Sequence, residues 1–169
     1  MTLDDAEARY RAVLAERTAA LAAALRRMIV ERPFALDPGV SLDTVDAVHF
    51  EYEWDSFQPV AIPLNTKTGY CGGGAILAVL PPGQSWLFPE EIDHAVTAAL
   101  PEIDPLDLGD ELGALKTRLF TDWFIATWRE ARGVAPATRG FLSVHDTIWR
   151  TDLDTGEKFR EDSGRIKFF

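Results

Sequence analysis

Three side chains with metal-binding chemistry alternate along one stretch of the sequence. His49, Glu51 and Glu53 stand two residues apart, and Asp55 continues the spacing. In a β-strand alternate side chains lie on one face, so the imidazole and the carboxylates would share a surface. A histidine with two carboxylates is a ligand set that iron, manganese or zinc accepts. Our first expectation is a protein without a cofactor, and a divalent metal on this face is the alternative.

A second histidine, His145, stands at the end of another expected strand and is followed by Asp146. Ligands that alternate along a single strand need a group from another element to close a metal site, and His145 could supply it. The competing interpretation is an ordinary solvated face, since half-buried antiparallel strands carry polar side chains on one side. We therefore favour a protein that is not an enzyme, with a metal-dependent hydrolase as the alternative.

The only cysteine, Cys71, precedes three glycines. A cysteine nucleophile needs a lowered pKa, usually from a helix N-terminus or a nearby cation. The residues around Cys71 are acidic, which favours a buried thiol beside a tight turn. The glycines lack the Lys-Ser or Lys-Thr pair that follows them in a phosphate-binding loop.

A loop rich in proline and glycine carries two large aromatic residues, and the start of an expected helix follows it. Loop aromatics beside acidic side chains can anchor a partner protein, because aromatic residues dominate the binding energy of many interfaces. Core packing of the same aromatics is the competing interpretation. The candidate partner-binding residues are Trp86, Phe88, Glu90, Glu91 and Asp93.

The net charge of −10 is concentrated in the middle of the chain. Residues 33–115 carry fourteen acidic groups and a single basic one, Lys67. Such a field repels nucleic-acid phosphates and anionic membranes, and it attracts basic proteins or cations. We therefore expect a basic protein as the partner, with neither nucleic acid nor a membrane as a target.

The elements that must position these residues follow from hydrophobic spacing. Apolar residues three and four apart predict a long helix over residues 3–31. Alternation predicts a strand over 45–54, with Val48, Phe50, Tyr52 and Trp54 on its apolar face. A second strand over 58–64 contains Pro59 and Pro63, which favour an edge position. A short apolar run over 75–80 favours a further strand.

The second half of the chain predicts two more helices and then strands. Pro89 suits the first turn of a helix that ends near residue 100, and the spacing over 110–132 predicts another helix. Strands are expected over 140–145, 147–151, 158–160 and 165–169. The segregated order predicts one α+β domain over residues 1–169, an antiparallel sheet of roughly five to six strands with the helices mainly on one face.

These observations predict a small acidic binding protein, of the immunity type that neutralises a toxin or nuclease by engaging its basic surface. The first alternative is the hydrolase with His49, Glu51 and Glu53 as metal ligands and His145 or Asp146 as acid or base. A homodimer through the long first helix is the second. Charged residues interrupt every apolar run that could serve as a signal peptide or a membrane span, so we expect a cytoplasmic protein.

Overall fold

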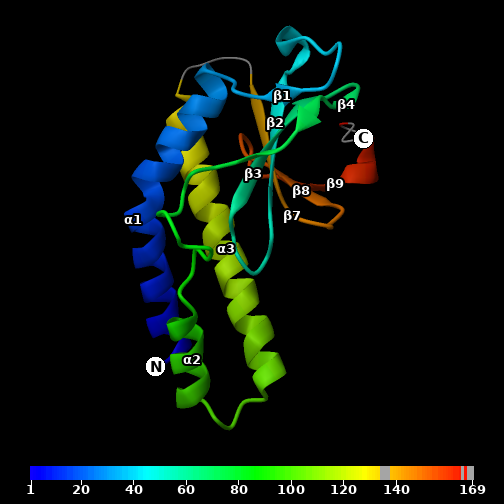
Figure 1. The fold of residues 1–169 in the computed structure, drawn as a ribbon. Coiled ribbons are helices and arrows are strands. Elements are labelled where there is room, and N and C mark those ends of the chain that lie inside the picture. The colour runs from blue at the N-terminus through cyan, green and yellow to red at the C-terminus, as the bar shows by residue number, and fades with distance from the viewer. Residues whose placement is uncertain (134–137, 165, 167–169) are drawn as a thin grey trace.

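The computed structural model describes residues 1–133, 138–164 and 166 (Figure 1). Helix α1 spans Leu3–Val30, as its apolar spacing predicts. It begins at a capping box, in which the backbone N–H of Asp5 donates to Oγ1 of Thr2 while the N–H of Thr2 donates to Oδ2 of Asp5. It ends just before Arg32, whose φ of 49° lies in the left-handed region.

Two further helices run alongside α1. Helix α2 spans Glu90–Ala99 and helix α3 spans Pro105–Arg132. The expectation that α3 begins at residue 110 is wrong by five residues. Asp104 accepts a hydrogen bond from the N–H of Leu106, and Pro105 occupies the first turn, so the acidic connection is itself the helix start.

Within the residues that the structure describes, the main sheet has seven strands in the order β4-β3-β2-β7-β8-β9, with β6 also paired to β3. A separate two-stranded sheet joins β1 to β5. The described residues also form short 3-10 helices at Leu42–Thr44 and Glu161–Ser163. The strands are β1 Ala35–Leu36, β2 Ala47–Tyr52, β3 Pro59–Asn65, β4 Gly69–Tyr70, β5 Gly72–Gly73, β6 Ala75–Ile76, β7 Arg139–Val144, β8 Trp149–Asp152 and β9 Lys158–Arg160.

The expected edge position of β3 is wrong. This strand pairs with β2 on one side and with β4 and β6 on the other. Proline lacks an N–H donor but keeps its carbonyl. The carbonyls of Pro63 and Pro59 accept hydrogen bonds from the N–H groups of Cys71 and Leu77, at 3.0 and 2.9 Å. The apolar run over 75–80 is a strand only at Ala75–Ile76.

Strands β2 and β7 form the centre of the sheet and run parallel, while the other paired strands are antiparallel. A parallel pair needs a crossover connection, and here the chain between the two strands includes both α2 and α3. The sheet is therefore mostly antiparallel and mixed at its centre.

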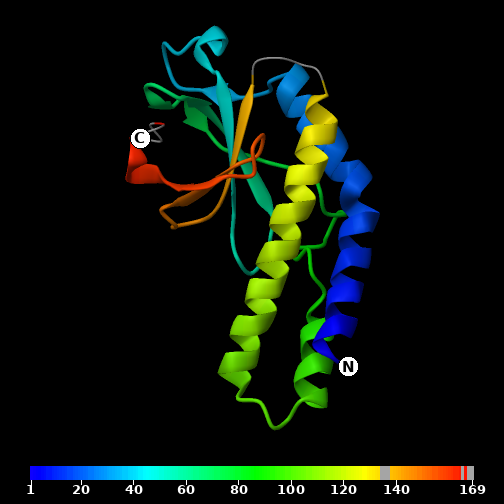
Figure 2. The same cartoon turned by 180° about the vertical axis from the view of Figure 1, so that it is seen from behind.

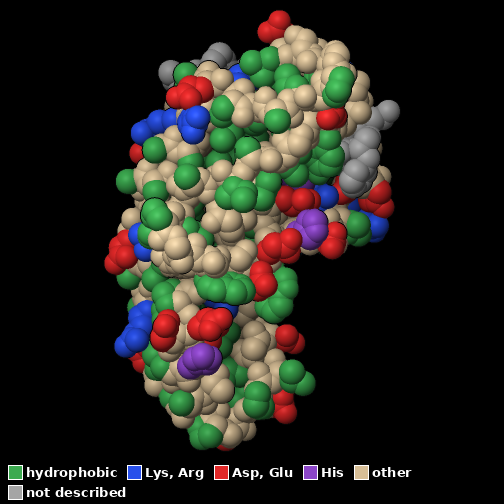
Figure 3. Space-filling view, viewed as in Figure 1, with side chains coloured by type: hydrophobic (Ala, Val, Ile, Leu, Met, Phe, Trp, Pro, Cys, Tyr) green, Lys and Arg blue, Asp and Glu red, His purple; other side chains and the backbone are tan. Residues whose placement is uncertain are grey.

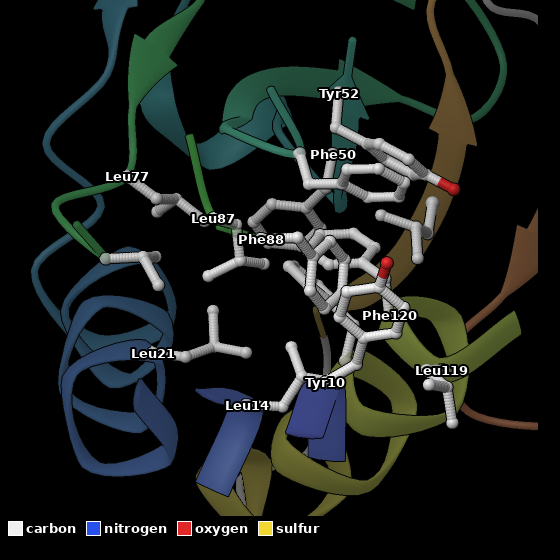
Figure 4. Close-up of a cluster of buried hydrophobic side chains, with 14 of the residues drawn as sticks. Tyr10, Leu14, Leu21, Phe50, Tyr52, Leu77, Leu87, Phe88, Leu119 and Phe120 are labelled. Carbon is white, nitrogen blue, oxygen red and sulfur yellow. The ribbon is translucent and has the colours of Figure 1, made fainter. Parts of the chain in front are cut away.

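Helices α1, α2 and α3 lie on the same side of the sheet, and β8 and β9 curl away from α3 (Figure 2). The main core fills the space between these layers with side chains from α1, α3, β2 and the segment 77–88, which point toward one another (Figure 4). Phe50, for example, contacts the rings of Phe124 and Trp128 of α3 at centroid distances of 5.1 and 5.6 Å. The predicted α+β class, with a long first helix and two further helices, is confirmed.

A second, smaller apolar cluster lies on the other face of the sheet and comprises Ala47, Leu64, Phe141, Phe159 and Ile166. Most of the strand expected over 165–169 lies outside the described residues. No helix in the described ranges is long and apolar enough to cross a membrane.

Candidate functional site

Strands β2 and β7 end side by side, and this brings together two turns that are far apart in the sequence. Glu51 pairs with Ser143 and Tyr52 with Val144 in the parallel register. The backbone N–H of His145 then donates to the carbonyl of Tyr52 at 2.8 Å. The turn that follows β2 and the turn between β7 and β8 therefore share one end of the sheet.

Three carboxylates surround the imidazole of His145 at this end. Nδ1 lies 3.3 Å from Oε2 of Glu51, and Nε2 lies 3.4 Å from Oδ1 of Asp146 and 3.9 Å from Oε1 of Glu53. The hydrogen bond to Glu51, followed by the charges of Asp146 and Glu53, raises the pKa of His145 above its ordinary value of 6.5. Glu51 lies in β2, while Glu53 and His145 lie just beyond the ends of β2 and β7.

Large apolar side chains stand exposed on the same two turns. Trp54 is 63% exposed and Ile148 is 51% exposed. The alternation placed Trp54 on the core face, and this expectation is wrong because β2 ends at Tyr52 and Trp54 lies in the following turn. We define the strand-end surface as Glu51, Glu53, Trp54, Asp55, His145, Asp146 and Ile148.

The molecule is hollowed on one side, and acidic side chains gather along the upper edge of this hollow with hydrophobic side chains beside them (Figure 3). Exposed apolar groups with a polar border are typical of protein interaction sites. Sequence reasoning missed Trp54 and Ile148. The sequence did contain a signal for their exposure, because the turn-forming residues Asp55, Ser56 and Asp146 lie close to them.

His49 shares the strand face with Glu51 but lies in a different environment. The side chain is fully buried, with Nδ1 2.7 Å from the hydroxyl of Tyr70 and Nε2 2.8 Å from Oγ of Ser143. Burial, with a contribution from the charge of Arg150, lowers the pKa of His49 to about 3. The imidazole is therefore neutral at neutral pH.

The expected ligand set His49, Glu51, Glu53 and His145 is accordingly divided, because both ring nitrogens of His49 contact hydroxyl groups. Within the part of the chain that the structure describes, no group of three or more metal-binding side chains has an arrangement that could hold a metal ion.

Beside His49 lies a buried ion pair. Arg150 is 4% exposed, its Nη2 lies 2.5 Å from Oε2 of Glu161, and it also donates to the carbonyl of Thr147. With Glu51, Tyr70 and His145 this pair lines a hollow of about 510 Å³. Arg150 through Thr147, and Glu161 through the hydrogen bond from its N–H to the carbonyl of Ile148, tie this pair to the turn between β7 and β8.

The residues in and after the loop before α2 that were expected to bind a partner fall into two groups. Some make contacts inside the protein, and the others are exposed. Phe88 is buried and packs edge-on against Tyr10 at a centroid distance of 5.1 Å, so it belongs to the core. Asp93 accepts hydrogen bonds from the hydroxyl of Tyr10 and from Nζ of Lys116, the latter at 2.8 Å. Trp86 is 42% exposed, and the side chains of Glu90 and Glu91 are also exposed.

This loop reaches the strand-end surface through its backbone. The N–H of Leu87 donates to the carbonyl of Ser56 at 3.0 Å, which holds the segment containing Trp86 beside the turn that follows β2. The backbone next to Trp86 is therefore tied to this turn, while Phe88 anchors the loop to the core.

Cys71 is buried, and burial raises the pKa of its thiol, which is opposite to what a nucleophile needs. The next residue, Gly72, allows β5 and β1 to pack closely. A Cβ at Gly72 would lie 2.2 Å from the carbonyl oxygen of Ala35 in β1, so only glycine allows the two short strands to pair.

Comparisons with protein-family models, curated proteins and solved structures found no match to this chain.

Proposed function

We propose that this protein is a small binding protein that holds a basic partner protein on its strand-end surface, in the manner of an immunity protein that neutralises a toxin or nuclease. The observation that carries the proposal is the exposure of Trp54 and Ile148 beside Glu51, Glu53 and Asp146. A few residues, with tryptophan among the commonest, supply most of the binding energy at interfaces. The surrounding carboxylates restrict the partner to one with a basic surface.

The charge distribution of the chain supports the same partner. Glu51, Glu53 and Asp55 belong to the acidic segment 33–115, in which Lys67 is the single basic residue. A field of this sign accelerates the encounter with a basic protein and weakens as salt screens it. Binding should therefore be fast at low ionic strength and should lose affinity as salt is added.

The test uses the intact protein immobilised as bait in a lysate of its source cells, with bound proteins quantified by mass spectrometry. The apolar variant carries Trp54→Ala and Ile148→Ala. Its matched control carries Val30→Ala and Leu106→Ala, which alter two side chains that are 77% and 81% exposed elsewhere. The charge variant carries Glu51→Gln, Glu53→Gln and Asp146→Asn, and its control carries Glu102→Gln, Asp110→Asn and Glu111→Gln.

We expect a basic protein that the parent and both controls retain and that high salt releases. Both strand-end variants should retain at least about tenfold less of it, since a loss of about 1.4 kcal/mol corresponds to a factor of ten. Equal retention by all five proteins would refute the proposal. The homodimer alternative predicts instead a molecular mass that rises with concentration in analytical ultracentrifugation.

A further inference from the structure

A cleft separates the middle of α3 from the curled half of the sheet. Its volume is about 410 Å³, within the range of sites that hold compact ligands or single large side chains. Helix α3 contributes Ala114, Thr117 and Thr121 to the lining, and the sheet contributes Leu142, Val144 and Trp149.

The cleft exists because the sheet is close to α3 at one end only. At the start of β7 the contact is tight, since a Cβ at Gly140 would lie 2.6 Å from the ring of Trp128 in α3. Further along, Leu142 pairs with Thr151 of β8, and Thr151 pairs with Lys158 of β9. Threonine and lysine replace the large apolar residues that would be needed to fill the space as β8 and β9 curl away (Figure 2).

The walls of the cleft suit one large apolar side chain. Leu142 and Tyr52 are buried at its floor, and Trp149, which is 42% exposed, forms a wall. Nζ of Lys158 lies 5.4 Å from the ring centroid of Trp149, so a cation already occupies one side of the indole. An aromatic or branched side chain entering the cleft would pack against Trp149 and the floor, while the charged side chains of Arg118, Asp122 and Lys158 also line the cleft.

The cleft opens next to the strand-end surface. Thr147 and Trp149 line the cleft. Ile148 lies between them in the sequence, and His145 and Asp146 directly precede Thr147. One partner can therefore contact both features at once. A second copy of this chain is the poorer occupant, because its own net charge of −10 would face the same carboxylates.

We propose that the partner inserts one large apolar side chain into the cleft between α3 and β8, from a segment whose flanking lysines or arginines contact Glu51, Glu53 and Asp146. The inference rests on the proposed function and specifies the partner chemistry of the same site: a basic segment with a central aromatic or branched residue.

Two synthetic peptides test it, Arg-Arg-Trp-Arg-Arg and Arg-Arg-Gly-Arg-Arg, each labelled with a fluorophore for polarisation measurements. Ala114→Phe fills the cleft from an exposed position of α3, and Thr117→Phe fills it from the next turn. Ala23→Phe, at an exposed position of α1, adds the same ring elsewhere. The charge variant of the strand-end surface is the fourth protein, and thermal unfolding checks that each variant folds.

We expect the parent and Ala23→Phe to bind the tryptophan peptide about tenfold more tightly than the glycine peptide, with both affinities reduced by salt. The two cleft-filling variants should lose this preference and keep the salt-sensitive binding. The charge variant should bind both peptides more weakly. Equal affinity of the parent for the two peptides would overturn the cleft proposal alone. If the charge variant bound each peptide as tightly as the parent does, the proposed function would be overturned as well.

Discussion

Nε2 of His49 lies 2.8 Å from Oγ of Ser143, and this contact joins the two central strands across 94 residues of sequence. His49 belongs to β2 and Ser143 to β7, and both side chains are buried. The hydrogen bond lies directly below the strand-end surface, so it fixes the two strand ends that carry Glu51 and His145.

Removing the hydroxyl of Ser143 tests this linkage. Ser143→Ala takes away the partner of a buried ring nitrogen, and we expect the free energy of unfolding to fall by about 1–3 kcal/mol. Denaturation in urea, with Ser85→Ala at an exposed position of the loop before α2 as a comparison, measures the effect. An unchanged stability in Ser143→Ala would show that the contact contributes nothing.

The burial of His49 predicts acid sensitivity. Its pKa in the folded protein is about 3, below the ordinary 6.5, so the unfolded chain takes up a proton first as the pH falls. The stabilising contribution is complete above pH 6.5 and is lost progressively between pH 6.5 and 3, with a slope of about 1.4 kcal/mol per pH unit from this group.

The matched variant is His49→Gln, which keeps a polar side chain that does not titrate. Its free energy of unfolding should fall less steeply than that of the parent between pH 6.5 and 4. Parallel curves for the two proteins in urea titrations at several pH values would contradict the prediction.

His145 should show the opposite behaviour. Its contact with Glu51 raises its pKa, so the protonated form is favoured in the folded protein. The associated stabilisation is present below pH 6.5 and disappears as the pH rises through the raised pKa. An NMR titration should place its midpoint above 6.5. Glu51→Gln should lower that midpoint, while Glu90→Gln on α2 should leave it unchanged.

Two glycine substitutions should change stability in opposite directions. A Cβ at Gly140 would lie 2.6 and 2.7 Å from atoms of the Trp128 ring, so Gly140→Ala should destabilise the protein by about 1–3 kcal/mol. Gly113 lies inside α3 with nothing within 4 Å of the same position, so Gly113→Ala should stabilise by about 0.5–1 kcal/mol. Thermal unfolding of the two variants measures both, and equal shifts would refute the packing argument.

Periodicity was sufficient to predict the helices and most strands, because it reports which face of an element is buried. It placed His49 and Glu51 on one face correctly. It could not show that His49 would be covered by Tyr70 and Ser143 while Glu51 stayed accessible, because strand neighbours come from pairing that local sequence does not encode.

Two of the errors arose where elements end. Trp54 continues the alternation of β2, yet the strand stops at Tyr52 and the side chain emerges in the turn. Asp104 and Pro105 resemble a connection by composition, yet they are the cap and first turn of α3. The cleft beside Trp149 was equally inaccessible to sequence reasoning, because it depends on how the sheet curls relative to a helix.

The parallel pairing of β2 with β7 also affects how the chain folds during synthesis. The hairpin of β2 and β3 can form early, but the inner edge of β2 must wait until residues 139–144 leave the ribosome. Until then the nascent chain exposes an unsatisfied strand edge containing Val48 and Phe50, which invites pairing with other chains. Fragments that stop before β7 should therefore aggregate, and contacts of such long sequence separation should make refolding slow.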